Sequence, residues 1–350
     1  MPTVPASDTS VQNVAVVGVG RMGQHHARVY SQMPSCKLVA VCDANRENAE
    51  KVAQLYHCAA FTDVQSMVQA KLNLHAATIA VPTVHHWPMA SVLLNHDIDI
   101  LVEKPLAQNT HDASAILQLA EEKKRILQVG HSERFNPVLR ALKKYELRPQ
   151  FIEVQRISPM TFRSIDVGAV LDLMIHDLDI VLHLVACPVQ DVSAVGVSVI
   201  GLHEDIANVR LTFANGCIAN ITASRLALKT ERKMRLFSPN AYVSVDYQRK
   251  SGVVITRTAN AEQLERVRQQ VRTGQVADLS QLNYPELVKY EELQVLDIEP
   301  LRAEQESFLA SVRTRSTPEV TGQDGYAAVD IAGRILESIA HHPWQVPPLA

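Results

Sequence analysis

The stretch VAVVGVGRMG, residues 14–23, decides the fold class. Four apolar residues suited to a buried parallel strand lead directly into a G-x-G-x-x-G run that opens a helix. Gly18 permits a tight turn, Gly20 lets a pyrophosphate approach the backbone, and Gly23 lets helix and strand pack closely. The N-terminus of the helix adds N–H groups and a positive dipole end for phosphates. The stretch therefore predicts a dinucleotide-binding strand–turn–helix unit.

An acidic residue supports this interpretation. Asp43 ends the next apolar run, 20 residues beyond Gly23. An acid at this place can bind both hydroxyls of a ribose and repels a 2′-phosphate, so NAD is favoured over NADP. Arg46 lies close enough to soften that preference. The alternative is that the glycines serve only to pack the helix against the strand.

Short apolar runs alternate with helix-like stretches through the first 130 residues. The runs are apolar on both faces, which is typical of a parallel sheet covered on two sides, and the alternation predicts a doubly wound α/β (Rossmann) sheet. Strands are expected at Val14–Val17, Leu38–Cys42, Ala77–Ala80, Ile98–Val102 and Ile126–Val129. Helices are expected at Gly23–Met33, Arg46–Leu55, Val64–Gln69, His86–Leu94 and Thr110–Lys123.

The pattern changes after about Arg134, where several strands follow one another with few helices between them. Asn215–Gly216 separates two of these runs and is a strong hairpin signal. We expect an NAD-binding domain over residues 11–131 and an α+β domain with a mostly antiparallel, open sheet over residues 132–340, with C-terminal helices that can pack back on the first domain. The polar segment Ala261–Glu299 is expected to be an excursion from the sheet. Strands are expected at Val189–Ile200, Ile206–Phe213, Cys217–Ser224, Lys233–Ser238, Ala241–Asp246 and Gly252–Arg257, and helices at Pro137–Lys144, Gly168–Val185, Leu301–Thr314 and Gly325–Ala340.

Composition excludes several function classes. The chain has 350 residues, 34 Lys and Arg against 37 Asp and Glu, and a net charge of −3, so neither a nucleic acid nor a membrane surface is an expected partner. No apolar stretch is long enough for a transmembrane helix, and the first ten residues do not resemble a signal peptide. The five cysteines are odd in number and form no C-x-x-C pair, which indicates neither disulfides nor a metal site and fits a cytoplasmic protein.

One strand ends in Glu103-Lys104-Pro105. Ligands of open α/β sheets bind outside the carboxyl ends of the strands, which places Lys104 at the cofactor crevice, where it can hold a substrate hydroxyl by charge-assisted hydrogen bonds. The alternative is a surface lysine that extends its ammonium into solvent.

The apolar segment Gly168–Val185 carries Asp172, His176, Asp179 and His183 at spacings of 4, 3 and 4. On an α-helix these four side chains share one stripe. One interpretation is that the stripe faces solvent. The other is that Asp172 and His176 face a cleft, with Asp172 orienting the imidazole as a general base, while the other two are structural.

The junction Gly130–Pro137 is rich in polar residues that can contact a ligand between the domains or serve as loop hydrogen-bonders. Val81–His85 leaves the same two alternatives.

Together these segments resemble the Gfo/Idh/MocA oxidoreductases, the family of glucose-fructose oxidoreductase and the inositol dehydrogenases. The resemblance covers about Gln12 to Ala340 and also rests on Asp324-Gly325 before the last helix. It implies a catalytic set of Lys104, Asp172 and His176, with a Lys104–Pro105 bond that is often cis. The cofactor-binding residues that it implies, with those of the glycine loop, are Gly18, Gly20, Arg21, Met22, Gly23, Asp43, Pro82, Thr83, His85, Glu103 and Lys104. The implied substrate-binding residues are Lys104, His131, Arg134, Asn136, Asp172 and His176.

The chain departs from the family pattern beside the catalytic helix. Where relatives commonly have Gly-Gly it has Val167-Gly168, and Met174 replaces a glycine, which implies a narrower space beside the nicotinamide. The sequences around Gly130–Pro137 and Leu171–Asp177 are most similar to a narrower subgroup, the UDP-N-acetylglucosamine 3-dehydrogenases, whose product leads to lipid A of the diamino type.

The expected activity is therefore NAD-dependent oxidation of a secondary hydroxyl of a sugar, with the 3-hydroxyl of UDP-N-acetylglucosamine as one candidate. A free sugar, inositol or another polyol is the second candidate substrate, and a non-catalytic NAD-binding regulator is a third hypothesis. The absence of an H-E-x-x-H or comparable motif argues against a metal-dependent hydrolase. A homodimer or homotetramer is expected, because the outer face of the antiparallel sheet has to be covered.

Overall fold

The computed structural model describes residues 11–160, 167–275 and 284–342. Its contacts divide the chain into two compact units. The first contains residues up to Phe135, Leu178–Ile180 and Ile298–Arg334; the second contains Asn136–Asp177, Val181–Asp297 and the residues from Ile335 onward. No helix in the described part of the chain is long and apolar enough to cross a bilayer.

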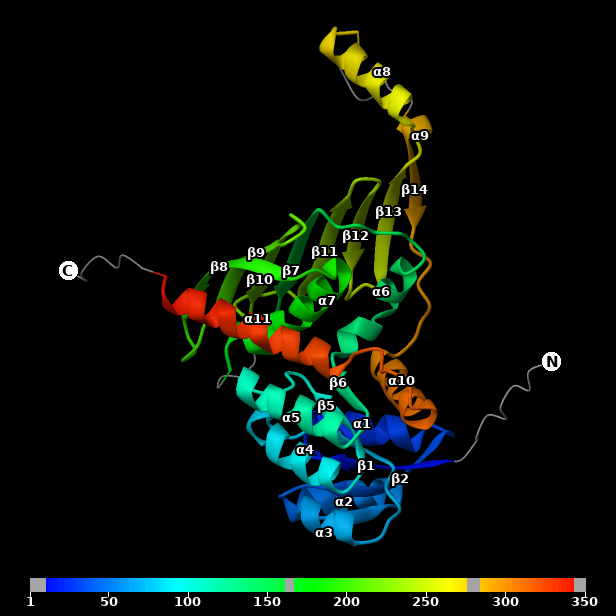
Figure 1. Cartoon of the computed structure of the whole chain (residues 1–350), viewed down its shortest axis with the longest axis vertical. Coiled ribbons are helices and arrows are strands. Elements are labelled where there is room, and N and C mark those ends of the chain that lie inside the picture. The colour runs from blue at the N-terminus through cyan, green and yellow to red at the C-terminus, as the bar shows by residue number, and fades with distance from the viewer. Residues whose placement is uncertain (1–10, 161–166, 276–283, 343–350) are drawn as a thin grey trace, which may run out of the picture. The chain divides into compact units, whose positions relative to one another are not determined.

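The first unit is built on a six-stranded parallel sheet with the order β3-β2-β1-β4-β5-β6 (Figure 1). This confirms the predicted doubly wound sheet. The short β3 was not predicted, because three residues give too little pattern to recognise. The strands are β1 (Gln12–Val17), β2 (Cys36–Cys42), β3 (Ala59–Phe61), β4 (Ala76–Ile79), β5 (Asp99–Glu103) and β6 (Leu127–Gly130). The helices are α1 (Arg21–Ser31), α2 (Arg46–Tyr56), α3 (Val64–Gln69), α4 (His86–Asn95), α5 (Thr110–Glu122) and α10 (Pro300–Thr314), with one-turn helices η1 (Thr83–His85) and η2 (Ser132–Phe135).

Two hydrophobic clusters cover the two faces of this sheet. Alternate residues of β1 divide between them, because successive strand side chains point to opposite faces. Ala15 and Val17 pack with α3, α4 and α5, whereas Val14 and Val16 pack with α1 and α2. The second cluster is completed from far along the chain by Phe308, Leu309 and Val312 of α10. The C-terminal segment is thus part of the core of the first unit.

The second unit contains an eight-stranded sheet with the order β14-β13-β12-β11-β7-β10-β9-β8, antiparallel except for the pair β7 and β10. This confirms the mostly antiparallel prediction. The strands are β7 (Phe151–Ile157), β8 (Val189–Val197), β9 (Ile206–Phe213), β10 (Ile218–Ser224), β11 (Glu231–Ser238), β12 (Ala241–Asp246), β13 (Ser251–Arg257) and β14 (Val288–Glu292).

The turn between β9 and β10 is at Asn215–Gly216, as predicted. Gly216 has a positive φ of 82°, which glycine tolerates without strain, and the side chain of Asn215 accepts a hydrogen bond from the Cys217 N–H at 3.0 Å.

The segment Ala261–Glu299 was expected to leave the sheet, and this expectation was wrong in part. Its helix α8 (Ala261–Arg272) has no buried residue and stands clear of the sheet (Figure 1), but β14 pairs with β13 as the edge strand. The alternation in β14 is masked by its charged residues, as is common in edge strands. The other helical elements are α6 (Pro137–Leu142), the π-helical turn η4 (Val170–Met174), α7 (Ile175–Val185), α9 (Tyr284–Leu287) and α11 (Gly322–Ala340).

Candidate active site

The three glycines of the loop after β1 have separate structural roles. Gly18 has a φ of +85°, and a Cβ there would lie 2.7 Å from the Ala80 carbonyl oxygen. A Cβ on Gly23 would lie 1.7 Å from the Gly18 carbonyl oxygen, so only glycine lets α1 start against the turn. Gly20 differs: nothing in the described structure lies within 4 Å of a Cβ built there. The surface in front of Gly20 is therefore open to a ligand.

A cavity of about 520 Å³ lies in front of this loop. Of the predicted cofactor-binding residues, it brings together Gly18, Gly20, Asp43, Pro82 and His85. The described residues that line it do not include Arg21, Met22, Gly23, Thr83, Glu103 or Lys104. The cavity therefore lies at the position where a strand–turn–helix unit of this kind binds a dinucleotide.

Asp43 lies in this cavity and is held by the backbone. Its Oδ2 accepts the Val19 N–H at 2.8 Å, and its Oδ1 accepts the Asn45 N–H at 2.9 Å. A carboxylate has about four acceptor positions, so two remain for the hydroxyls of a ribose. The side chain of Arg46 is 76% exposed and pairs with Glu50 at 3.6 Å. The open space at Gly20 and the oriented carboxylate both fit NAD.

Lys104 follows the last residue of β5 and is half-buried. The Lys104–Pro105 peptide bond is cis, as the family resemblance implied. Glu103 is 8% exposed; its Oε1 lies 2.7 Å from His26 Nε2, and its Oε2 accepts the Lys104 N–H at 3.1 Å. Both carboxyl oxygens of Glu103 are thus engaged in hydrogen bonds with other residues of the chain.

The predicted substrate-binding residues of the junction are buried. Arg134 is 4% exposed; its Nε and Nη2 donate to the carboxylate of Asp179 at 2.8 and 2.5 Å, and Asp324 lies 3.8 Å away. Asn136 accepts the Val138 N–H at 3.1 Å and so begins α6. His131 is 1% exposed, and neither ring nitrogen has a hydrogen-bond partner among the described residues. Burial lowers the pKa of His131, so its imidazole is neutral at pH 7.

The segment predicted as one helix begins with a π-helical turn. Asp172 lies in η4, whereas His176 lies in the first turn of α7, and both are half-buried. Besides Asp172, the other three residues of the predicted stripe lie in α7, where a regular α-helix keeps them on one face. Their surroundings differ: Asp179 is 1% exposed and paired with Arg134, whereas His183 is exposed.

Glu204 holds the start of the π turn. Its Oε1 accepts the Val170 N–H at 3.0 Å, and its backbone oxygen accepts the Ala169 N–H at 2.8 Å. A Cβ on Gly168 would lie 2.0 Å from the Glu204 carboxylate, so the glycine here makes room for the cap. Glu204 thus accepts hydrogen bonds from N–H groups at the start of the helical segment that have no partner within the helix.

Family models match both parts of the chain. The model for the oxidoreductase family with an NAD-binding Rossmann fold matches residues 12–131, and the GFO/IDH/MocA C-terminal domain matches residues 153–243. The chain belongs to the Gfo/Idh/MocA family. It is therefore an NAD-dependent oxidoreductase.

Individual relatives agree with this membership. A UDP-N-acetylglucosamine 3-dehydrogenase of Acidithiobacillus ferrooxidans is 36% identical over 233 residues, which cover 66% of this chain and 73% of the relative. The inositol 2-dehydrogenase of Rhizobium meliloti is 25% identical over 93% of this chain and 96% of its own. The solved structure of the Acidithiobacillus ferrooxidans enzyme matches with a TM-score of 0.82 and 29% identity, over 94% of this chain and 98% of its own.

Sequence reasoning missed several buried polar residues. His26, Glu304 and Gln305 were not singled out within their predicted helices, and the pair of Arg156 and Asp177, joined at 2.7 and 2.9 Å, was not predicted. Sequence spacing gave no signal for them, because the partners come from elements far apart in the chain.

Proposed function

We propose that this dehydrogenase oxidises the 3-hydroxyl of UDP-N-acetylglucosamine to the 3-keto sugar. The observation that supports the substrate is the 36% identity with a UDP-N-acetylglucosamine 3-dehydrogenase, together with a 29% identical solved structure of that name that covers 94% of this chain. The cavity at Gly18, Gly20 and Asp43 supports the cofactor. When bound, NAD supplies the acceptor for the hydride that leaves the substrate carbon.

The residues proposed for the chemistry are Lys104, Asp172 and His176. His176 takes the proton of the hydroxyl as general base, since an imidazole titrates near neutral pH. Asp172 orients that imidazole. The ammonium of Lys104 stabilises the alkoxide that forms as the proton leaves. His131, Arg134 and Asn136 remain proposed as substrate-binding residues.

The decisive experiment incubates the protein with NAD and UDP-N-acetylglucosamine, UDP-glucose, free N-acetylglucosamine or myo-inositol, and follows NADH absorbance. We expect turnover with UDP-N-acetylglucosamine to exceed the others. Turnover with myo-inositol alone would favour the second candidate, which the inositol 2-dehydrogenase aligned over 93% of the chain supports. NADH binding with no turnover on any of these compounds would favour a regulator.

The proposed catalytic residues are tested in the same assay. Lys104→Ala and His176→Ala should each lower kcat by roughly 10²–10⁴ with NADH affinity unchanged, because general acid–base help is worth about that factor. His183→Ala is the matched control for His176, since His183 lies on the same helix and is exposed. Wild-type kcat in either of the first two variants would remove that residue from the chemistry.

The cellular setting and the assembly are proposed from the cysteines and from the exposed apolar side chains of the eight-stranded sheet. All five cysteines are free thiols, which fits the cytoplasm. A homo-oligomer would cover apolar side chains such as Phe237 and Tyr290, which are 39% and 59% exposed on the eight-stranded sheet. A role in lipid A biosynthesis follows only if the nucleotide-sugar substrate is confirmed.

A further inference from the structure

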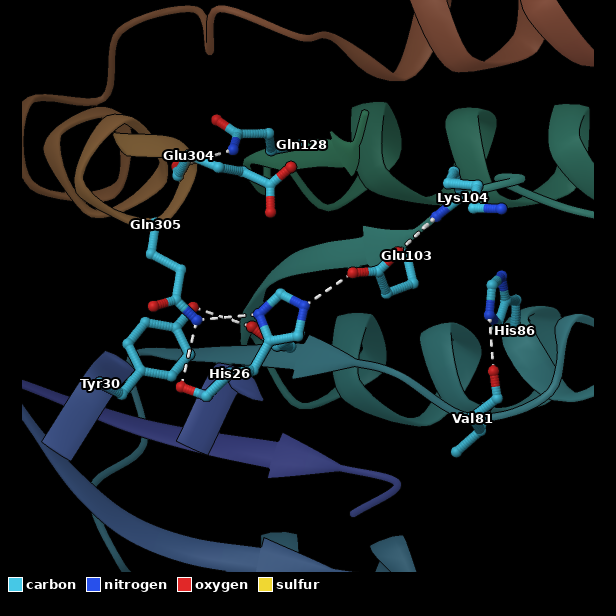
Figure 2. Close-up of polar contacts among 10 residues, drawn as sticks. His26, Tyr30, Val81, His86, Glu103, Lys104, Gln128, Glu304 and Gln305 are labelled. Carbon is cyan, nitrogen blue, oxygen red and sulfur yellow. Dashed lines mark hydrogen bonds and ion pairs between the residues drawn. The ribbon is translucent and has the colours of Figure 1, made fainter. Parts of the chain in front are cut away.

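A cluster of buried polar side chains surrounds Glu103, the residue that precedes Lys104, in the first unit (Figure 2). His26 comes from α1, Glu103 from the end of β5, and Glu304 and Gln305 from α10. His26, Glu304 and Gln305 are fully buried, and Glu103 is 8% exposed. One ring nitrogen of His26 and one carboxyl oxygen from each glutamate lie within 4.8 Å of one another.

The hydrogen bonds set the tautomer of His26. Gln305 Nε2 donates to His26 Nδ1 at 2.8 Å and to the His26 backbone oxygen at 3.3 Å. The opposite amide orientation would bring two oxygens together at the second contact, so Nδ1 is the acceptor and the proton is on Nε2. Nε2–H then donates to Glu103 Oε1 at 2.7 Å. The imidazole thus presents an N–H donor to Glu103.

The two glutamates have opposite charge states. Burial raises the pKa of Glu304 well above its usual range, and the nearby charge of Glu103 raises it further. Neither carboxyl oxygen of Glu304 has a hydrogen-bond partner in the described residues. Burial also acts to raise the pKa of Glu103, but its hydrogen bond and electrostatic interaction with His26, together with the charge of Lys104, outweigh burial and lower that pKa.

Two uncharged polar groups of other elements lie near Glu304. Gln128 on β6 donates to the Glu304 backbone oxygen at 3.0 Å. Tyr30 on α1 is bonded to Thr78 at 2.8 Å, and burial raises the pKa of its phenol. Of the two glutamates, Glu103 is therefore the one that carries the negative charge.

We propose that His26, Glu103 and Glu304 form a buried proton-holding cluster that positions Lys104. Glu103 accepts the Lys104 backbone N–H and places a negative charge beside that residue, and His26 holds Glu103 in place. Glu304 keeps its proton, so it adds no second negative charge near Lys104. The role of Lys104 rests on the proposed function; the charge distribution within the cluster does not.

The same three residues could instead ligate a metal ion. A metal bound at His26 Nε2 would displace the proton that this nitrogen donates to Glu103, so it would break the hydrogen bond that the proposal requires. Elemental analysis of the purified protein should therefore find no stoichiometric metal. A bound metal that Glu304→Gln removes would overturn the proposal.

The protonated Glu304 is tested by the pH dependence of stability. Its folded-state pKa is raised, so the folded protein keeps a proton that the unfolded chain releases above about pH 4.3, and stability is lost as pH rises toward the folded pKa. Glu304→Gln cannot release this proton. As pH rises above the unfolded pKa, the Tm of Glu304→Gln should rise relative to that of the wild type, by at most roughly 2 °C per pH unit for a chain of 350 residues. Parallel curves would overturn the proposal.

Two further variants serve as the control and as a second measurement for this test. Glu306→Gln, on the same helix and half-exposed, is the matched control and should give a curve parallel to the wild type. Glu103→Gln removes the charge that opposes ionisation of Glu304, so in this variant the loss of stability with pH should end at a lower pH than in the wild type, and this readout does not need Glu304→Gln to fold. A loss that ends at the wild-type pH would count against the cluster.

The positioning role is tested by the kinetics of Glu103→Gln. We expect kcat to fall by about 10–100-fold, because small misplacements of a catalytic group cost that much, with KM for the sugar and Kd for NADH within about twofold of wild type. Unchanged kcat would refute the positioning role. If the wild type oxidises none of the sugars, the proposed function fails, whereas the stability curves still decide the charge distribution of the cluster.

Discussion

The glycine loop offers a pair of substitutions whose effects should separate fold from ligand binding. In Gly23→Ala the new methyl carbon would lie 1.7 Å from the Gly18 carbonyl oxygen and 2.8 Å from its carbonyl carbon. Both obstacles are backbone atoms, so no rotamer change relieves the contact and α1 must move away from the turn. Overpacking of a core costs 1–3 kcal/mol when side chains can adjust, so we expect roughly 3 kcal/mol or more here.

Gly20→Ala adds the same methyl group three residues earlier with a different outcome. Nothing in the described structure lies within 4 Å of the new carbon, and the backbone there has a negative φ of −64° that alanine accepts. The stability of the ligand-free protein should therefore stay within about 0.5 kcal/mol of wild type. The methyl group instead points into the space left for the pyrophosphate, and we expect NADH affinity to fall by about 10–100-fold.

The assay is thermal unfolding with and without NADH, together with NADH titration by fluorescence. At roughly 1.4 °C for each kcal/mol in a chain of 350 residues, Gly23→Ala should lower the Tm of the free protein by about 4 °C or more. Gly20→Ala should keep the wild-type Tm in the absence of ligand and lose most of the increase in Tm that NADH causes. A wild-type Tm in Gly23→Ala would refute the steric argument. Wild-type NADH affinity in Gly20→Ala would show that the cavity at this loop is not the cofactor site.

Two other side chains give predictions of different kinds. Asp43→Ala should weaken NADH binding by about 10–100-fold and reduce the preference for NADH over NADPH, because the carboxylate that receives the ribose hydroxyls is lost; equal losses for both cofactors in parallel titrations would contradict this. Asp179→Asn should lower the free energy of unfolding in urea by about 3–5 kcal/mol, because it removes the carboxylate that pairs most closely with the buried guanidinium of Arg134. Asp324→Asn should cost less than half as much, because Asp324 lies 3.8 Å from the same guanidinium and is one-third exposed. Equal losses in the two variants would refute this ranking.

The fold could be predicted from the sequence where local pattern and tertiary role coincide. Val14–Val17 is apolar on both faces because the strand is covered on both faces, and Asn215–Gly216 makes the turn that its residue types favour. β14 was missed because the charged residues of an exposed edge strand hide its alternation. The π turn at Val170–Met174 has no composition signal of its own and depends on Glu204, more than 30 residues later, to cap it.

The candidate site, like the fold, could be predicted only in part from the sequence. The cavity contains the predicted loop glycines Gly18 and Gly20 and the predicted acid, because the loop and the end of β2 meet at the carboxyl edge of one sheet. The polar residues of the junction were also singled out, but their partners were not: Arg134 meets Asp179 across 45 residues of sequence, and no spacing rule relates them. Pairing over such distances depends on the assembled core.

Three acidic residues of the first unit show why charge state in particular cannot be taken from sequence. Asp43 lies at an open cavity and is held by backbone N–H groups, Glu103 is buried and stays charged because His26 donates to it, and Glu304 is buried beside that charge and keeps its proton. The same functional group is thus a cavity-lining acceptor at Asp43, a buried charged anchor at Glu103 and a buried neutral group at Glu304. What separates them is the count of donors around each carboxyl group, because burial without donors favours the acid and burial with donors favours the anion. That count follows from α1, β5 and α10 meeting in one core, so the neighbours of a carboxyl group decide whether it carries charge at neutral pH.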